Sequence, residues 1–245
     1  MPGAAADMQS DARQLSIIVP VLDEAAGIAD SLRALAALRA AGAEIVVVDG
    51  GSRDATCACA APHADRVVAA PRGRGAQLHA GAKLARGEVL LFLHADTRLP
   101  PDAWPAMQAA LAGGQAWGRF DVHMEGGGWV LALVARMMNA RSRLSGIATG
   151  DQAIFARRDF YLRTGGFPDI ALMEDIAFSA AARRLERPAC LAARVSASPR
   201  RWQKHGVLAT VLLMWRLRAA YFFGADPQAL ALAYGYTPRG RDGEH

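Results

Sequence analysis

The chain has 245 residues, of which 52% are hydrophobic, and a formal net charge of +5. This length and apolar content suit one α/β domain. The basic residues are scattered, which excludes a nucleic-acid-binding arm and favours a small anionic partner such as a phosphate-bearing ligand. The 3 cysteines lack CxxC spacing, which excludes a disulfide framework and a zinc site and fits a reducing cytoplasm.

The chain is expected to begin with a disordered tail, because residues 1–14 are small and polar and lack the apolar segment of a signal peptide. Residues 15–205 are predicted to form the main domain, and residues 206–245 a helical extension of it. The longest apolar stretches, 128–138 and 207–214, fall short of the roughly 20 residues that a membrane span needs. The sequence therefore predicts a soluble or peripheral protein.

Short β-branched runs alternate with segments of helical periodicity through the first half of the chain. Such runs are typical of parallel strands that are covered by helices on both faces. The pattern predicts a doubly wound, mostly parallel sheet flanked by helices. The expected strands are 16–22, 43–49, 66–69 and 88–94, and the expected helices are 25–41, 52–61 and 75–85.

Polar side chains follow three of these strands, at the edge where open parallel sheets bind ligands. Taken alone, Ser52 and Asp54 could be turn or capping residues, but three polar strand ends together favour a binding site. A divalent cation such as Mg²⁺ or Mn²⁺ takes one or two carboxylates and completes its shell with phosphate oxygens and water. The residues at these ends are Asp23 and Glu24, then Asp49, Ser52 and Asp54, then His94 and Asp96.

Glycine-rich phosphate loops of the common kinds are missing, because neither GxxxxGK[ST] nor GxGxxG follows a strand. Arg72 and Arg74 instead precede a helix that is expected to start near Gly75, where a cation and backbone N–H groups together favour a phosphate. Solvated loop arginines are the alternative. Gln77 is a further candidate, either as a nucleotide contact or as a cap.

Two adjacent carboxylates, Glu174 and Asp175, open a helix in the second half of the chain. Acidic residues at this position complement the helix dipole, so the pair alone does not require a catalytic role. The helix is predicted to bury the face that carries Ile176, Phe178 and Leu185.

Four segments together resemble the family 2 nucleotide-sugar glycosyltransferases of GT-A fold, over about residues 16–202. They are SIIVPVLDE, VVVDGGSRDAT, GRGAQLHAGAKLARGEVLLFLHADT and GGFPDIALMEDIAFSAAARRL. The motifs LHADT, GDQAIF and LMEDI resemble those of a small bacterial branch of that family. The resemblance implies an inverting transfer of sugar from a nucleotide-diphosphate sugar to an acceptor hydroxyl, by single displacement and with the help of Mg²⁺ or Mn²⁺.

The resemblance also implies roles for the residues at the strand ends. Asp49 matches the carboxylate that hydrogen-bonds the base, and Asp96 matches the metal-ligand position. His94 replaces the first aspartate of the usual Asp-x-Asp signature, so it is either a second ligand or a hydrogen-bonded histidine at the end of a strand. The remaining donor-binding candidates are Pro20, Glu24, Ser52, Asp54 and Arg74.

On the acceptor side, the resemblance implies that Asp175 is the general base and that Glu174 supports it. Asp151, in a Gly-Asp turn, is placed to touch the donor sugar or the acceptor, although a structural role is equally open. His205 is either a late histidine that closes on the metal or a surface residue. The segment 200–202 lacks the glutamine of the processive Q-x-x-R-W motif, so no polymerase activity is inferred.

Two other classes remain as alternatives. A nucleotidyltransferase would share the sheet and the metal but should carry a glycine-rich basic loop after the first strand, where this chain has Leu22, Asp23 and Glu24. A non-catalytic nucleotide-sugar-binding protein would keep Asp49 and lack the acidic pair at the start of the later helix.

The predicted helix 207–224 carries large apolar side chains beside two arginines. It either packs on the core or forms a peripheral membrane contact that brings the site to a lipid-linked acceptor at the inner face of the membrane. The residues concerned are Val211, Leu212, Trp215, Arg216, Arg218, Phe222 and Phe223.

Overall fold

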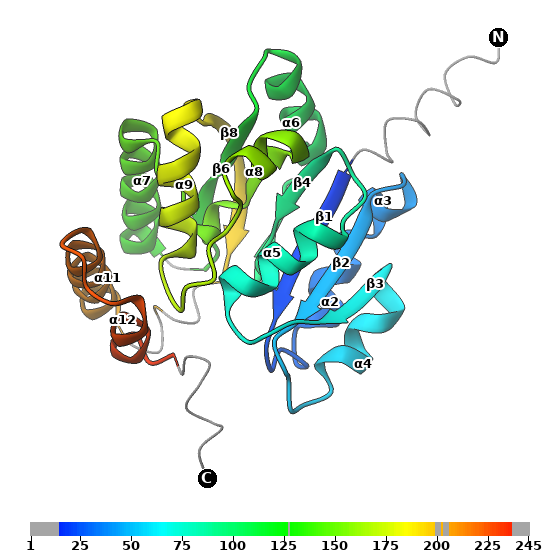
Figure 1. The fold of residues 1–245 in the computed structure, drawn as a ribbon, viewed down its shortest axis with the longest axis horizontal. Helices are drawn as coiled ribbons and strands as arrows, with labels where there is room; N and C mark the ends of the chain where they lie inside the picture. The colour runs from blue at the N-terminus through cyan, green and yellow to red at the C-terminus, as the bar shows by residue number, and fades with distance from the viewer. Residues whose placement is uncertain (1–14, 127, 199–201, 203–205, 237–245) are drawn as a thin grey trace.

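The structure, a computed structural model, describes residues 15–126, 128–198, 202 and 206–236. The predictions for the tail 1–14 and for His205 therefore lie outside the described residues. An eight-stranded sheet in the order β3-β2-β1-β4-β7-β6-β8-β5 runs through the described part of the chain, with helices on both sides (Figure 1).

The first half of the sheet is parallel, as the sequence predicts. β1 pairs with β2 and β4, and β2 pairs with β3, all in parallel. The strands are β1 (Leu15–Val21), β2 (Glu44–Asp49), β3 (Arg66–Ala69) and β4 (Val89–Phe92), each within two residues of its expected bounds.

The second half adds strands that the sequence analysis did not predict. β7 (Ile154–Arg157) lies antiparallel between β4 and β6 (Trp117–Met124). β8 (Ala189–Ala197) then pairs in parallel with β6 and antiparallel with β5 (Thr97–Arg98). The sheet is therefore mixed, and β7 joins its parallel first half to the second half.

One predicted helix is divided in two. The segment 25–41 forms α2 (Ile28–Arg33) and α3 (Ala36–Ala40), because the N–H of Leu35 bonds to the carbonyl of Leu32, three residues back, and so interrupts the α-helical ladder. The other helices are α4 (Thr56–Ala60), α5 (Arg74–Leu84), α6 (Ala103–Ala112), α7 (Gly128–Ser145), α8 (Arg158–Arg163), α9 (Glu174–Leu185), α11 (Val207–Phe222) and α12 (Pro227–Ala233), with short 3₁₀ turns at Ala61–His63 and Gly150–Gln152.

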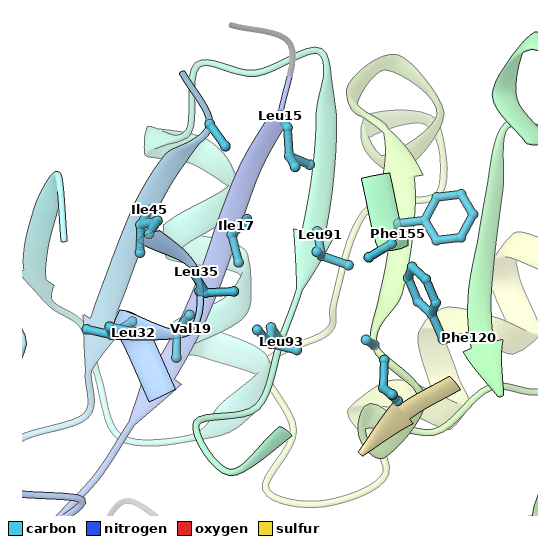
Figure 2. Packing of buried hydrophobic residues seen from close by; sticks show 14 of the residues in the cluster. Leu15, Ile17, Val19, Leu32, Leu35, Ile45, Leu91, Leu93, Phe120 and Phe155 are labelled. Carbon is cyan, nitrogen blue, oxygen red and sulfur yellow. The ribbon is translucent and has the colours of Figure 1, made fainter. Parts of the chain in front are cut away.

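The two faces of the sheet bury separate hydrophobic clusters because successive strand residues point to opposite sides. Ile17 and Leu91 face α2, α6 and α7, in the cluster that Figure 2 shows from close by. Ile18 and Leu90, their chain neighbours, face α5, α8 and α9. Covering both faces in this way explains why the strands read as continuous apolar runs.

The predicted buried face of α9 is correct for Phe178, which is fully buried, and wrong for Leu185, which is 57% exposed at the end of the helix. Ile176 is half-buried against a third cluster, which α9 shares with the C-terminal helices. In that cluster Leu217 of α11 packs near Leu172 and Met173. The C-terminal helices thus lie against the segment that leads into α9.

Candidate active site

A cleft of about 440 Å³ lies beyond the carboxyl ends of β1 and β4. It gathers residues from the loop after β1, the start of α5, the turn after β4 and the 3₁₀ turn before β7. A smaller pocket of about 80 Å³ shares several of these residues and reaches the start of α9. Of the predicted site residues, Pro20, Glu24, Arg74, His94, Asp96 and Asp151 line the cleft, and Arg74, His94, Asp151, Glu174 and Asp175 line the smaller pocket.

A partly buried ion pair joins the first half of the chain to the second half. Nε of Arg74, the first residue of α5, lies 3.2 Å from Oε1 of Glu174, the first residue of α9. The Glu174 carboxylate raises the pKa of Arg74, whereas burial raises the pKa of Glu174 against the opposing effect of Arg74. Gly75 permits this approach, since a Cβ there would lie 2.2 Å from the Pro168 carbonyl oxygen.

Asp175 is held in a fixed orientation at the mouth of the smaller pocket. Its Oδ2 accepts a hydrogen bond from the Gly150 N–H at 2.8 Å, and its Oδ1 accepts one from the Ile176 N–H at 2.7 Å. Met173, just before the acidic pair, has a φ of 72°. A left-handed backbone at a non-glycine residue costs about 1–3 kcal/mol, and it turns the chain so that α9 starts at the pocket.

His94, which follows β4, contacts the 3₁₀ turn that precedes β7. Its Nδ1 lies 3.4 Å from Oδ1 of Asp151, and a Cβ added to Gly150 would lie 2.3 Å from its Nε2. Burial alone would lower the pKa of His94, but the hydrogen bond and charge of Asp151 reverse this and raise it. Conversely, His94 and Arg74 lower the pKa of Asp151 in spite of its burial. The contact between these two side chains therefore links the turn after β4 to the Gly150 turn.

Asp96 is half-buried and lines the cleft from the turn that follows β4. Within the described residues, no cluster of three or more histidine, cysteine, aspartate or glutamate side chains is arranged to hold a metal ion. Mg²⁺ and Mn²⁺ use few protein ligands where phosphate oxygens and water complete the shell. One carboxylate facing a cleft of this size, which has room for phosphate groups and water, fits such an ion, whereas His94 already has Asp151 as its partner.

Three of the predicted donor-binding residues do not line the cleft. The buried Asp49 carboxylate accepts hydrogen bonds from the Gly51 and Ser52 backbone N–H groups, each at 3.0 Å, and from the Ser52 hydroxyl. Asp54 accepts from the Ala25 N–H at 3.0 Å and from the Thr56 hydroxyl, and this second bond lowers its pKa. These groups connect the loop after β2 to the loop after β1, and they shape the cleft indirectly by positioning the β1 loop.

Of the two further candidates of this region, Gln77 lines the cleft, and both make structural contacts. Gln77 is buried, and its side-chain amide donates to the carbonyls of Val21 and Val48, at 2.9 and 2.8 Å. It thereby joins the carboxyl ends of β1 and β2. The Arg72 guanidinium lies 5.5 Å from the centre of the Tyr236 ring, a cation–π contact with the C-terminal extension.

Part of the cleft wall comes from residues that the sequence analysis did not single out. Thr210 and Met214 of α11 line it, together with Tyr234 and Tyr236 after α12. The C-terminal extension therefore completes the site. The Gly150 backbone was also missed, although the GDQAIF motif that contains it was noticed.

The family model described as "Glycosyl transferase family 2" matches residues 16–163. The chain therefore belongs to glycosyl transferase family 2, as its motifs indicate. The narrower bacterial branch stays a prediction.

Among curated proteins, the chain is similar to an undecaprenyl-phosphate 4-deoxy-4-formamido-L-arabinose transferase of Pseudomonas paraeruginosa. The two are 31% identical over 156 residues, which are 58% of this chain and 46% of that protein. An uncharacterized glycosyltransferase of Mycobacterium tuberculosis is 34% identical over 98 residues, 40% of this chain and 43% of that protein. The chain thus spans less than half the length of these curated relatives.

Solved structures share the fold. A mannosyltransferase from Pyrobaculum calidifontis in complex with GDP-Man and Mn²⁺ has a TM-score of 0.61 and 21% identity, covering 84% of this chain and 61% of that chain. Staphylococcus aureus TarS 1-349 in complex with UDP has a TM-score of 0.60 and 19% identity, covering 76% and 60%. These likenesses confirm the predicted GT-A fold.

Proposed function

We propose that this protein is an inverting glycosyltransferase, which moves a sugar from a nucleotide-diphosphate sugar to an acceptor. The observation that carries this proposal is the position of Asp175, which shares a pocket with Arg74, His94 and Asp151 beside a cleft that can hold a nucleoside diphosphate. The glycosyltransferase complexes with UDP and with GDP-Man support a nucleotide-sugar donor.

Each group in the pocket has a chemical task in this reaction. Arg74, at the start of α5, binds the diphosphate together with the backbone N–H groups of that helix end. Glu174 neutralises and orients the Arg74 guanidinium. Asp175 takes the proton of the acceptor, whose oxygen attacks the anomeric carbon opposite the leaving diphosphate, so that the configuration inverts without a covalent intermediate.

A divalent cation is part of the proposal, with Asp96 as its protein ligand and His94 as a neighbouring group. When bound, Mg²⁺ or Mn²⁺ neutralises the charge that develops on the departing nucleoside diphosphate. The complexes of structural relatives with Mn²⁺ support the involvement of a divalent cation. Pro20 and Glu24 are proposed to contact the nucleotide from the loop after β1, and Asp49 to hydrogen-bond its base. Ser52 and Asp54 are proposed to hold the loop after β1 in place.

The substitution Asp175→Asn tests the proposed base. An amide keeps the shape of the carboxylate but cannot accept a proton, so transfer should fall at least about 100-fold while UDP and Mn²⁺ bind as before. Donor binding is measured by calorimetry, and transfer by release of nucleoside diphosphate from UDP- or GDP-sugars. Transfer near the wild-type rate would move the base to Glu174 or Asp151.

A lipid-linked acceptor and a peripheral membrane contact complete the proposal. The name of the Pseudomonas relative pairs a sugar transferase with undecaprenyl phosphate, which supports an acceptor of this kind. No helix within the described ranges is long and apolar enough to cross a bilayer. Leu208, Trp215, Phe222 and Phe223 on and just after α11 are more than half exposed, which suits contact with a membrane surface.

A further inference from the structure

An apolar groove of about 250 Å³ lies between α7 and α11, two helices that are near one another at one side of the molecule (Figure 1). Asp151 lines this groove as well as the donor cleft and the small pocket that holds Asp175. Met214 likewise lines all three. The groove therefore meets the proposed site of sugar transfer at one of its ends.

The α7 wall of the groove is a single stripe of side chains. Val134, Met137, Met138 and Arg141 line it at spacings of three, four and seven residues, which place them on one face of a helix. Three apolar residues thus precede one arginine. At 1.5 Å per residue, the stripe is about 10 Å long.

The α11 wall repeats the same pattern. Val211, Met214, Trp215 and Arg218 line the groove at identical spacings, again with the arginine at the C-terminal end of the stripe. Arg218 also lines the pocket that holds Asp175. The two stripes therefore form an apolar channel with a pair of guanidinium groups at the end that meets the reaction site.

The guanidinium of Arg141 has donors that nothing in the described part of the chain satisfies. Its Nε and Nη2 are buried, and neither has a hydrogen-bond partner among those residues. Burial and the neighbouring charge of Arg218 lower the pKa of Arg141 to about 10, with only a weaker opposing effect from Asp175. A half-buried cation with unsatisfied donors beside a second cation is a costly arrangement unless an anion binds between them.

An anion with a long apolar chain complements both parts of the groove. Two arginines match the charge of a phosphate monoester, about −1.5 to −2 at neutral pH, better than the single charge of a carboxylate. Two of the groove-lining side chains, Met137 and Trp215, are 51% and 59% exposed, so a chain longer than the groove can leave toward the surface. There it would meet the exposed apolar residues Leu133 and Leu208 of the same two helices.

We propose, on the basis of the glycosyl transfer proposed above, that the acceptor is the phosphate monoester of a long-chain lipid alcohol. Arg141 and Arg218 bind its phosphate, and its chain lies between α7 and α11. A phosphate oxygen then forms the bond to the anomeric carbon while the bond from that carbon to the diphosphate oxygen breaks. The electron pair leaves with the nucleoside diphosphate, and any proton on the attacking phosphate passes to Asp175.

Binding of decyl phosphate to the full chain, followed by the fluorescence of the tryptophans or by calorimetry, tests this assignment. Decanol and inorganic phosphate are the comparison ligands, since each carries one half of the recognition. Decyl phosphate should bind at least about tenfold more tightly than either. Equal binding of decanol would overturn the role of the arginines, and equal binding of inorganic phosphate would overturn the role of the groove.

Two substitutions separate the phosphate contacts from the apolar wall. Arg141→Met and Arg218→Met, which keep an unbranched side chain, should each weaken decyl phosphate at least about tenfold. Val211→Trp, which fills the groove, should weaken decyl phosphate and leave inorganic phosphate unchanged. The matched control is Arg136→Met, because Arg136 is exposed on α7 and does not line the groove.

Binding of UDP with Mn²⁺ is measured on every variant, and it reports a folded donor site independently of the acceptor. Wild-type decyl phosphate affinity in both arginine variants, with UDP binding intact, would refute the acceptor site while leaving the proposed glycosyl transfer standing. Absence of UDP binding in the wild type, with decyl phosphate still bound, would instead refute the donor half and retain the lipid phosphate site.

Discussion

Removing Arg74 should destabilise the fold in a manner that depends on pH. The Glu174 side chain is only 4% exposed and has Arg74 as its ion-pair partner at 3.2 Å. In Arg74→Met the carboxylate loses this partner and stays buried beside Asp175. Breaking a fully buried pair costs about 3–5 kcal/mol, but the Arg74 side chain is 37% exposed, so we expect about 2–3 kcal/mol at pH 8.

The direction of the pH effect follows from the burial of Glu174. Burial already raises the pKa of this group, and loss of Arg74 raises it further above the unfolded value of about 4.3. A carboxyl group whose folded pKa is raised leaves the fold most stable at low pH, where it is protonated in both states. Stability is then lost at roughly 1.4 kcal/mol per pH unit as pH rises from the unfolded pKa to the folded pKa.

Thermal unfolding by circular dichroism at pH 5 and pH 8 measures the effect. A loss of about 2–3 kcal/mol lowers the Tm of a chain of this size by roughly 4–12 °C, and most of that difference should disappear at pH 5. The control is the double variant Arg74→Met with Glu174→Gln, in which no buried carboxyl group is left to titrate at this position. If the single variant loses the same stability at both pH values, Glu174 does not depend on Arg74 for its charge.

Two other perturbations test the cation site and the membrane contact. Asp96→Ala should weaken Mn²⁺-dependent UDP binding more than about 100-fold and His94→Ala roughly tenfold, because Asp96 faces the cleft while His94 is paired with Asp151. Calorimetry measures both affinities, and equal losses in the two variants would contradict this division of roles. Phe222→Ser with Phe223→Ser should lower sedimentation with anionic vesicles at least about tenfold, because burial of each ring contributes about 1.5–3 kcal/mol of binding free energy. The control Leu185→Ser, at an exposed apolar residue on α9, should not lower it. Undiminished vesicle binding in the double variant would rule out these rings as the contact.

The parallel half of the fold could be predicted because its signals are local. β2 is an uninterrupted β-branched run, and Asp49 marks its end both in the sequence and in the structure. β7 has only four residues, and its partners β4 and β6 lie far away along the chain, so nothing in the sequence alone specifies its antiparallel position. Short strands of this kind are selected by tertiary pairing rather than by local pattern.

The same distinction applies to the site. Asp96 and His94 line one cleft, as expected, because both follow the same strand and lie two residues apart, and the strand order places this strand beside the cleft. The Arg74–Glu174 pair joins residues 100 positions apart, and its partners were predicted separately, one for phosphate and one for the base. Arg218 was singled out only as a membrane-facing candidate and Arg141 not at all, because helical periodicity alone does not tell which neighbour a helix face meets.

The pairing of β6 with β8 has a consequence for how this chain can be divided. The family model ends at residue 163, before β8 begins, yet β6 forms one of its two ladders with Ala189–Ala197. A fragment cut at that boundary would expose β6, with Trp117 and Phe120, as an unprotected sheet edge of the kind that recruits other chains and aggregates. Synthesis of this region on the ribosome would pass through this state, so the nascent chain depends on the later strand Ala189–Ala197 to close the edge before misassembly begins.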